Sequence, residues 1–284
     1  MSADTLRAPV ADRLSLRLLR GELRFIATRR RNQIALAVLC GVPVVLALVL
    51  KLSGAAEHTA SAPPMVAMMF GNGMLVVLAA FSVESLIFLP LAVAVLSADA
   101  VSGEAAAGTL RYLLTVPIGR TRLLCVKFAA NAIAVVAAVA AVALCGAIAG
   151  IAAFGAGDLV TLSGSTIPFG DSLGRVALVC LYVMAMMIAF STVTLFAATC
   201  TDHPATAIVG SLLYVLCDQL LVSVPELDWL DPYLLTGYWR DWGDLVREPV
   251  QTGNLTIGLV VAGVYAAVFA SAAWARFTTR DITC

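Results

Sequence analysis

Acidic, hydroxyl and glycine residues gather in one polar loop of an otherwise apolar chain. Asp99, Ser102 and Glu104 lie close together, a composition typical of the start of a helix. The glycines of the loop allow close approach of another surface and unusual backbone angles. A plain connection would not need one or two short helices, so the pattern predicts a docking element for another protein. The candidate docking residues are Asp99, Ser102, Gly103, Glu104, Gly108, Thr109 and Arg111.

A second candidate for chemistry is Glu84, which lies near the middle of an apolar segment. A charge at the centre of a membrane span costs about 2.5–3.5 kcal/mol on insertion scales, so this side chain should face the bundle interior or a cavity. It could contact a substrate or cation, or act as a protonatable gate. Equally, it could be a structural acid, protonated or hydrogen-bonded to Ser82, Ser85 or another helix. Pro90 predicts a kink in the same helix.

Motifs for nucleotide, metal or disulfide chemistry are missing from the sequence. There is no G-x-x-x-x-G-K-[ST] loop, and neither Lys51 nor Lys127 follows a glycine, so the chain cannot bind ATP in that manner. The seven cysteines form no CxxC and no Cys/His cluster, which argues against a disulfide framework or a zinc site. We expect no catalytic residues, no metal site and no cofactor bound by this chain.

The composition is that of a membrane protein. Of 284 residues, 61% are hydrophobic and only 13% are charged, against about a quarter charged in typical soluble domains. The mean hydropathy is +0.96. So few charges could not cover a water-exposed surface, and no basic face is left over for nucleic acid.

Six stretches reach the roughly 20 mainly apolar residues that a membrane-spanning helix needs. They are residues 34–52, 74–98, 128–154, 173–198, 205–224 and 255–274. The sequence therefore predicts an all-α polytopic membrane protein, with six transmembrane helices in a domain at residues 32–276. The polar loop, at residues 99–127, and an outer loop at residues 225–253 connect the spans.

The distribution of basic residues predicts the orientation. Fourteen of the eighteen Lys and Arg residues lie in the N-terminal segment, the loop at residues 99–127 or the C-terminal end. Basic residues concentrate in cytoplasmic loops. Both termini, including the tail at residues 277–284, are therefore expected in the cytoplasm.

An amphipathic helix is predicted at residues 13–31, after a flexible N-terminus at residues 1–12. Leucines recur there at helical spacing, and a second stripe consists of Arg13, Arg17, Arg20 and Arg24. Such a helix lies in the membrane interface. It could serve only as a topology anchor on anionic lipid, or it could also touch a cytoplasmic partner.

The outer loop at residues 225–253 interleaves acids with tryptophans and tyrosines. Aromatic side chains of this kind settle at the level of the lipid headgroups. The loop could contain a short interfacial helix or re-entrant element, or it could be an ordinary loop anchored by Trp229, Trp239 and Trp242. Asp218 and Gln219, at the end of the preceding span, are expected to reach the outer interface.

The polar loop resembles the signature of ABC-2 type transporter permeases. The matching residues are Asp99, Gly103, Glu104, Gly108, Thr109, Leu110, Arg111, Leu113, Leu114, Pro117, Arg120 and Lys127. The interfacial helix, the six spans and the closing tail are similar to the six-span, single-domain subgroup. Many relatives carry more charge after Gly-Glu, where this chain has Ala105, Ala106 and Ala107, and this difference would re-tune docking.

The resemblance implies the permease subunit of an ATP-driven exporter in a bacterial plasma membrane. Such a subunit forms the pathway as a dimer, with a second copy or a paralogue, and two separate ATP-binding subunits hold ATP and Mg²⁺. The loop around Glu104 would be the coupling helix, and Glu84 and Pro90 are candidate pathway residues. The alternative is an ion-coupled secondary transporter that uses Glu84, although the inverted repeats usual in such transporters are not found.

Overall fold

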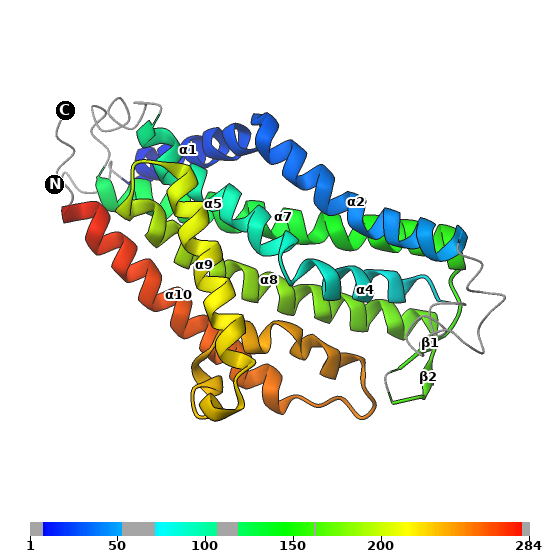
Figure 1. Cartoon of the computed structure of the whole chain (residues 1–284). Helices are drawn as coiled ribbons and strands as arrows, with labels where there is room; N and C mark the ends of the chain where they lie inside the picture. The colour runs from blue at the N-terminus through cyan, green and yellow to red at the C-terminus, as the bar shows by residue number, and fades with distance from the viewer. Residues whose placement is uncertain (1–7, 53–71, 107–118, 162, 280–284) are drawn as a thin grey trace.

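The chain folds into long α-helices that run roughly side by side (Figure 1). The computed structural model describes residues 8–52, 72–106, 119–161 and 163–279. The helices are α1 (Ala8–Thr28), α2 (Arg30–Leu52), α4 (Met74–Glu84), α5 (Phe88–Ala106), α7 (Arg120–Phe154), α8 (Phe169–Cys200), α9 (Pro204–Val222) and α10 (Gly253–Thr279). A two-stranded antiparallel hairpin, β1 (Leu159–Val160) and β2 (Thr166–Ile167), joins α7 to α8, with Leu159 opposite Ile167.

Five of the described helices are long and apolar enough to cross a membrane: α2, α7, α8, α9 and α10. Helices α4 and α5 pass the same test together, as one span with a bend of 67°. Counting that bent pair as one span gives six. The prediction of an all-α polytopic membrane protein is confirmed.

The second span is not the single kinked helix expected over residues 74–98. Helix α4 ends at Glu84, and α5 begins at Phe88 and continues to Ala106. The cause is Pro90, which has no backbone N–H and therefore leaves the carbonyl of Leu86 without its helical partner. The side-chain amide of Gln219 on α9 donates to that carbonyl at 3.1 Å.

Helix α1 begins at Ala8 rather than Arg13, so residues 8–12 are helical and not part of a flexible segment. Pro9 does not prevent this, because proline is well tolerated in the first turn of a helix. Helix α1 ends where the side-chain amides of Asn32 and Gln33 donate to the carbonyls of Ile26 and Ala27, at 3.0 and 2.9 Å. These bonds satisfy two of the carbonyls that the end of a helix leaves open.

Much of the loop expected at residues 99–127 is helical instead. Helix α5 runs on to Ala106, and α7 begins at Arg120, directly after Gly119. Polar residues ended the predicted spans, but helices continue past the apolar region until a breaker such as Gly119 intervenes. Residues 107–118 of this loop lie outside the described part of the chain.

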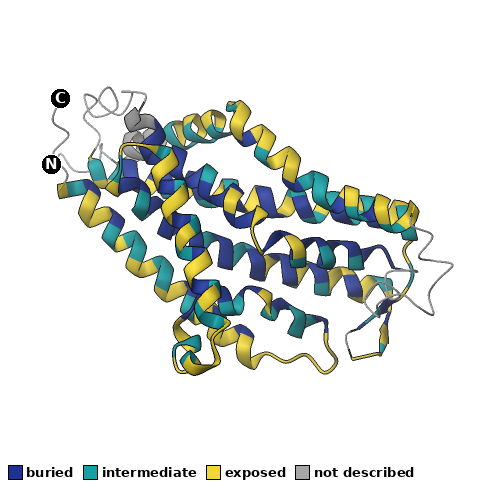
Figure 2. Ribbon diagram, in the orientation of Figure 1, coloured by how far each residue is buried: buried dark blue, intermediate teal, exposed yellow. Residues whose placement is uncertain are grey.

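Helix α8 is the central helix of the bundle, as Figure 2 shows. In its most apolar stretch, 67% of the residues are buried, against 17% for both α2 and α10. Its buried side chains include Val183, Met186 and Phe190, and it packs against α5, α7, α9 and α10. The outer helices leave leucine and valine side chains exposed, as suits a surface in contact with lipid.

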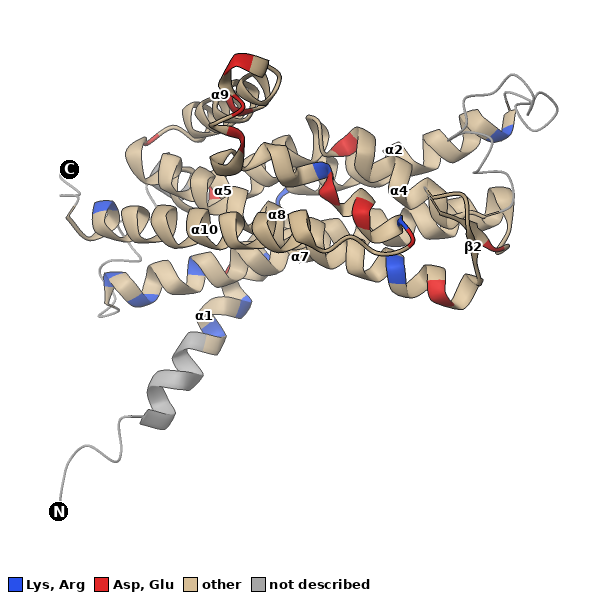
Figure 3. Cartoon of the chain, turned by 90° about the horizontal axis from the view of Figure 1, so that it is seen from below, with Lys and Arg blue, Asp and Glu red and all other residues tan. Residues whose placement is uncertain are grey.

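The charges divide between two ends of the bundle (Figure 3). We call the region where α1, the end of α5, the start of α7 and the end of α10 meet the basic end. Most of the described lysines and arginines lie there. The opposite, acidic end carries the hairpin and three 3₁₀-helices, η1 (Pro225–Leu227), η2 (Asp231–Tyr233) and η3 (Thr236–Val246).

The segment at residues 225–253 is folded against the bundle. Trp239 and Trp242 are buried in the protein, not placed at the headgroup level, and the ring of Trp239 packs edge-on against Phe190 at 5.8 Å. Asp218 is also buried, contrary to expectation, and its Oδ2 accepts a hydrogen bond from the backbone N–H of Thr236 at 2.7 Å. Only a three-dimensional contact between α9 and η3 could reveal this pairing.

Candidate functional site

Asp99 connects the base of α5 to the junction of α1 and α2. Its side chain is only 5% exposed, and Arg29 Nη1 lies 3.0 Å from its Oδ2. Arg31 pairs with the other carboxylate oxygen. The guanidinium of Arg29 also lies over the ring of Phe25, 4.1 Å from its centre. The junction is therefore held to α5 by two cations on one buried carboxylate.

A second ion pair connects α1 to α7. Lys127 Nζ donates to Glu22 Oε1 at 2.9 Å, and the two side chains are 0% and 11% exposed. A buried pair of this kind contributes mainly by avoiding an uncompensated charge, so loss of either partner is costly. Helix α1 is thus a packed part of the bundle, in addition to having an exposed basic face.

The end of α10 is attached to the start of α7 by two hydrogen bonds. Arg120 Nη1 donates to the carbonyl of Thr278 at 3.0 Å, and Trp274 Nε1 donates to Thr121 Oγ1 at 3.0 Å. Together with the two ion pairs, these contacts connect α1, α2, α5, α7 and α10 to one another at the basic end.

Three of the candidate docking residues are buried inside the chain. Asp99 is ion-paired, and Ser102 is fully buried with its hydroxyl donating to the carbonyl of Ala98 at 2.7 Å. A methyl group on Gly103 would lie 2.9 Å from Asp99 Oδ1 and 3.1 Å from Arg29 Nη1, so glycine allows the close approach of the junction. The prediction that Asp99 and Ser102 start a helix is wrong: α5 continues through them because Ala98 and Val101 extend its buried face.

The remaining docking candidates are not placed by the structure. Glu104 lies in α5, but its side chain is outside the described part of the chain, as are Gly108, Thr109 and Arg111. On the interfacial helix, Arg17, Arg20 and Arg24 are exposed, and the side chain of Arg13 is likewise not described. The docking role of these residues remains a prediction.

Glu84 is a fully buried acid on α4. It is 0% exposed, and neither carboxylate oxygen has a hydrogen-bond partner among the described residues. The expected serine partners bond to backbone instead: Ser82 donates to Leu78 and Ser85 to Ser82. Glu84 ends α4, directly before the break that Pro90 causes.

Asp218 and Gln219 have roles in the fold that the sequence did not predict. The two residues join the break between α4 and α5 to η3, through Leu86 and Thr236. A polar cavity of ≈170 Å³ lies between these elements, lined in part by Ser85, Gln219, Thr236 and Arg240. The signal that could have found them was an acid beside an amide in an otherwise apolar span. Within the described ranges, no group of three or more His, Cys, Asp and Glu residues is arranged to hold a metal ion.

The fold defines the class of protein: a multi-pass helical membrane protein whose second span is broken next to a buried acid. A family model described as "ABC-2 family transporter protein" matches residues 25–218, which extend from the end of α1 to the buried Asp218 of α9. The chain belongs to the ABC-2 transporter family and is a permease of ABC-type transport. A comparison with curated proteins finds no match.

Proposed function

We propose that this chain is the membrane subunit of an ATP-driven exporter, with its basic end in the cytoplasm of a bacterial cell. Two separate ATP-binding subunits, which carry ATP and Mg²⁺, dock beneath that end. A second permease copy, or a paralogue, completes the pathway. ATP binding brings the motor subunits together, and the turn of α5 around Gly103 and Glu104 receives the motion.

The observation that carries this proposal is the continuity of α5. One helix runs from Phe88, beside the break and Glu84, to Ala106 at the basic end. Next to Gly103 it is held to the α1–α2 junction through Asp99. A displacement applied at Glu104 therefore moves the basic end and the break between α4 and α5 together, because a packed helix transmits motion as a rigid element.

The dimer is supported by an exposed apolar stripe on α9. Val209, Leu213, Leu216 and Leu220 are all about half exposed or more, and they recur at helical spacing. Gly146 and Gly150 form a GxxxG motif on α7, but this motif does not support the dimer because it packs within the chain. Gly146 packs against Val77 and Gly150 packs against the backbone of Gly73, both within the chain.

The proposal is tested with a candidate ATP-binding subunit, co-purified with the permease in nanodiscs. Glu104→Ala should reduce the stimulation of ATPase activity by the permease, or reduce co-purification. Glu226→Ala removes an exposed acid at the acidic end and is the matched control. Equal assembly and equal stimulation in the two variants would contradict the docking role of Glu104.

One observation favours the second candidate, an ion-coupled transporter. Glu84 is a fully buried acid without a partner among the described residues, the kind of group that protonation can switch in membrane pumps. This candidate requires transport into vesicles that depends on an ion gradient and proceeds without nucleotide. Loss of that transport in Glu84→Gln would support it, and strict dependence on ATP would exclude it.

A further inference from the structure

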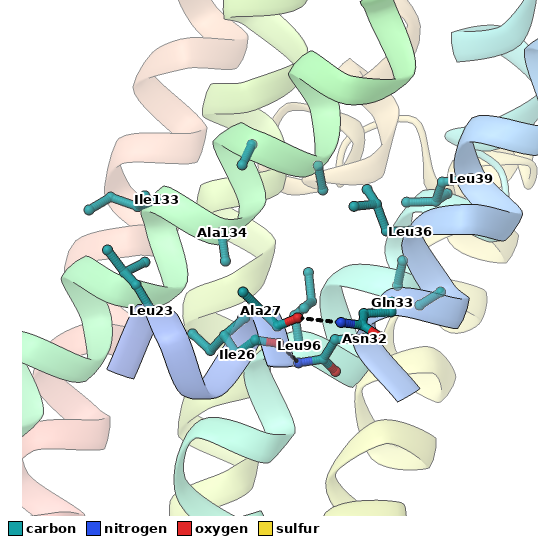
Figure 4. Close-up of a pocket in the computed structure, with 14 residues that line it drawn as sticks. Leu23, Ile26, Ala27, Asn32, Gln33, Leu36, Leu39, Leu96, Ile133 and Ala134 are labelled. Atoms are coloured by element: carbon teal, nitrogen blue, oxygen red, sulfur yellow. Dashed lines mark hydrogen bonds between the residues drawn. The ribbon is translucent and has the colours of Figure 1, made fainter. Parts of the chain in front are cut away.

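A cavity of ≈330 Å³ lies next to the junction of α1 and α2 (Figure 4). Leu23 and Ile26 of α1 and Leu36 and Leu39 of α2 line two of its sides, and α5 and α7 complete it. Ligand pockets span roughly 300–1,000 Å³, so this one lies at the lower end of the range. The lining is almost entirely hydrocarbon, and the space suits one slender apolar chain.

The mouth of the cavity opens between two membrane spans. Leu36 of α2 and Ile133 of α7, at the rim, are 39% and 44% exposed, whereas Leu39 and Ala138 are buried. Because α2 and α7 cross the membrane, these exposed rim residues face the hydrocarbon of the bilayer. The molecules that reach such a mouth from the bilayer are lipid acyl chains.

The end of the cavity nearest the junction is polar. Asn32 is only 6% exposed, and its Nδ2 donates to the carbonyl of Ile26 (Figure 4). Its Oδ1 is buried without a hydrogen-bond partner among the described residues. An unsatisfied buried acceptor costs free energy, so a hydroxyl group of a ligand would stabilise this end of the cavity.

Exposed basic side chains lie close in sequence to the residues that line this end of the cavity. On α1, Leu23 and Ile26 line the cavity, whereas Arg20 and Arg24 are exposed, and Arg30 is exposed just beyond the junction. Arginines at a membrane surface attract anionic headgroups. The three features together describe a lipid with a slender chain, a phosphate and a hydroxyl.

We propose that this cavity binds one acyl chain of a phosphatidylglycerol-type lipid. Its phosphate lies among the arginines of α1 and the junction, and a glycerol hydroxyl donates to Asn32 Oδ1. Phosphatidylcholine offers the same chains but neither the net charge nor a hydroxyl donor. A bound lipid here would support the junction that Asp99 holds to α5. The proposal does not depend on the motor subunits.

The test is native mass spectrometry of the purified full chain with added phosphatidylglycerol or phosphatidylcholine. Ala134→Phe places a ring in the cavity from α7, and Ala140→Phe adds the same ring to an exposed site of α7 outside it. The wild-type protein and Ala140→Phe should retain one phosphatidylglycerol. Ala134→Phe should bind it at least about tenfold more weakly, because several methylene groups lose their burial.

A second variant tests the headgroup. Asn32→Leu keeps the cavity apolar and removes the acceptor, so the preference for phosphatidylglycerol over phosphatidylcholine should fall. Independently of any variant, a phosphatidylglycerol with a photoreactive acyl chain should label wild-type peptides within residues 23–39 or 133–138. Equal binding by Ala134→Phe and Ala140→Phe, equal retention of the two lipids by the wild type, or labelling confined to other helices would overturn the proposal.

Discussion

Gln219 on α9 donates a hydrogen bond to the carbonyl of Leu86, the backbone group that Pro90 leaves without a partner. One side chain from the fifth span thus stabilises the break in the second. Since the neighbouring Asp218 holds η3 through Thr236, the break, α9 and the folded outer segment form one unit.

Removal of this amide should loosen the break. Gln219→Leu is expected to lower the free energy of unfolding by about 0.5–1.5 kcal/mol, as for one lost hydrogen bond. Steric-trapping measurements in bicelles give this quantity. In a Pro90→Ala background, alanine restores the N–H partner of Leu86, so Gln219→Leu should cost less there. Equal costs in the two backgrounds would contradict the pairing.

Loss of one partner in the Lys127–Glu22 pair should strongly lower the free energy of unfolding. Lys127→Met leaves a poorly exposed carboxylate unpaired, and the expected cost is about 3–5 kcal/mol. The double variant Lys127→Met with Glu22→Leu removes both charges and should recover most of the loss. The measurement compares the unfolding free energies of Lys127→Met, Glu22→Leu and the double variant. A double variant as unstable as the sum of the two single changes would show that the residues do not interact.

Gly103→Ala should preserve assembly with the ATP-binding subunit but weaken the stimulation of its ATPase activity. The added methyl group meets the Asp99 carboxylate and the Arg29 guanidinium at close range, so these side chains must shift and their ion pair between α5 and the α1–α2 junction is weakened. Gly41→Ala, which adds a methyl group to α2 with nothing within 4 Å, is the control. With an ATP-binding partner, Gly103→Ala should assemble but show less stimulated ATPase activity than Gly41→Ala. Equal stimulated ATPase activity in the two variants would show that the α1–α2 junction does not take part in coupling.

The outer segment should respond to pH through Asp241. Burial first, and then the charge of Asp244, raise the pKa of Asp241 above its ordinary value. A raised carboxyl pKa means that the folded state holds the proton more tightly, so stability falls as pH rises through the ordinary pKa toward the folded one. Asp241→Asn should therefore raise the melting temperature at neutral pH.

The same substitution should have little effect below the ordinary aspartate pKa of about 3.9, where Asp241 is protonated in both states. Melting curves of detergent-solubilised protein at several pH values, with the exposed Asp228→Asn as control, give the comparison. An Asp241→Asn effect that is independent of pH would contradict this assignment.

Long apolar stretches made most spans predictable, because a lipid-exposed helix must be apolar along its whole length. The break between α4 and α5 was harder to predict. Pro90 indicated a kink, but the side chain that satisfies the open carbonyl of Leu86 is Gln219, which lies far along the chain. The burial of Trp239 was missed for the same reason, since aromatic residues look alike in sequence whether lipid or Phe190 covers them.

The candidate site shows the same limit. The sequence identified the polar loop, but the buried position of Asp99 depends on its ion pairs with Arg29 and Arg31, which lie at the junction of α1 and α2. Likewise, Lys127 was counted only as a basic residue near the membrane, and its partner Glu22 became visible only when α1 packed on α7. Ion pairs between distant segments are set by packing and leave no local pattern.

In the proposed function, the basic end of the permease docks a motor subunit. The most direct measurement replaces Glu104 with a photocrosslinking amino acid in the co-purified complex, and does the same at Glu226 as the control. We expect crosslinks to the ATP-binding subunit from position 104 alone, with a yield that changes when ATP is added. Crosslinks from position 226, or none from position 104 in an assembled complex, would contradict it.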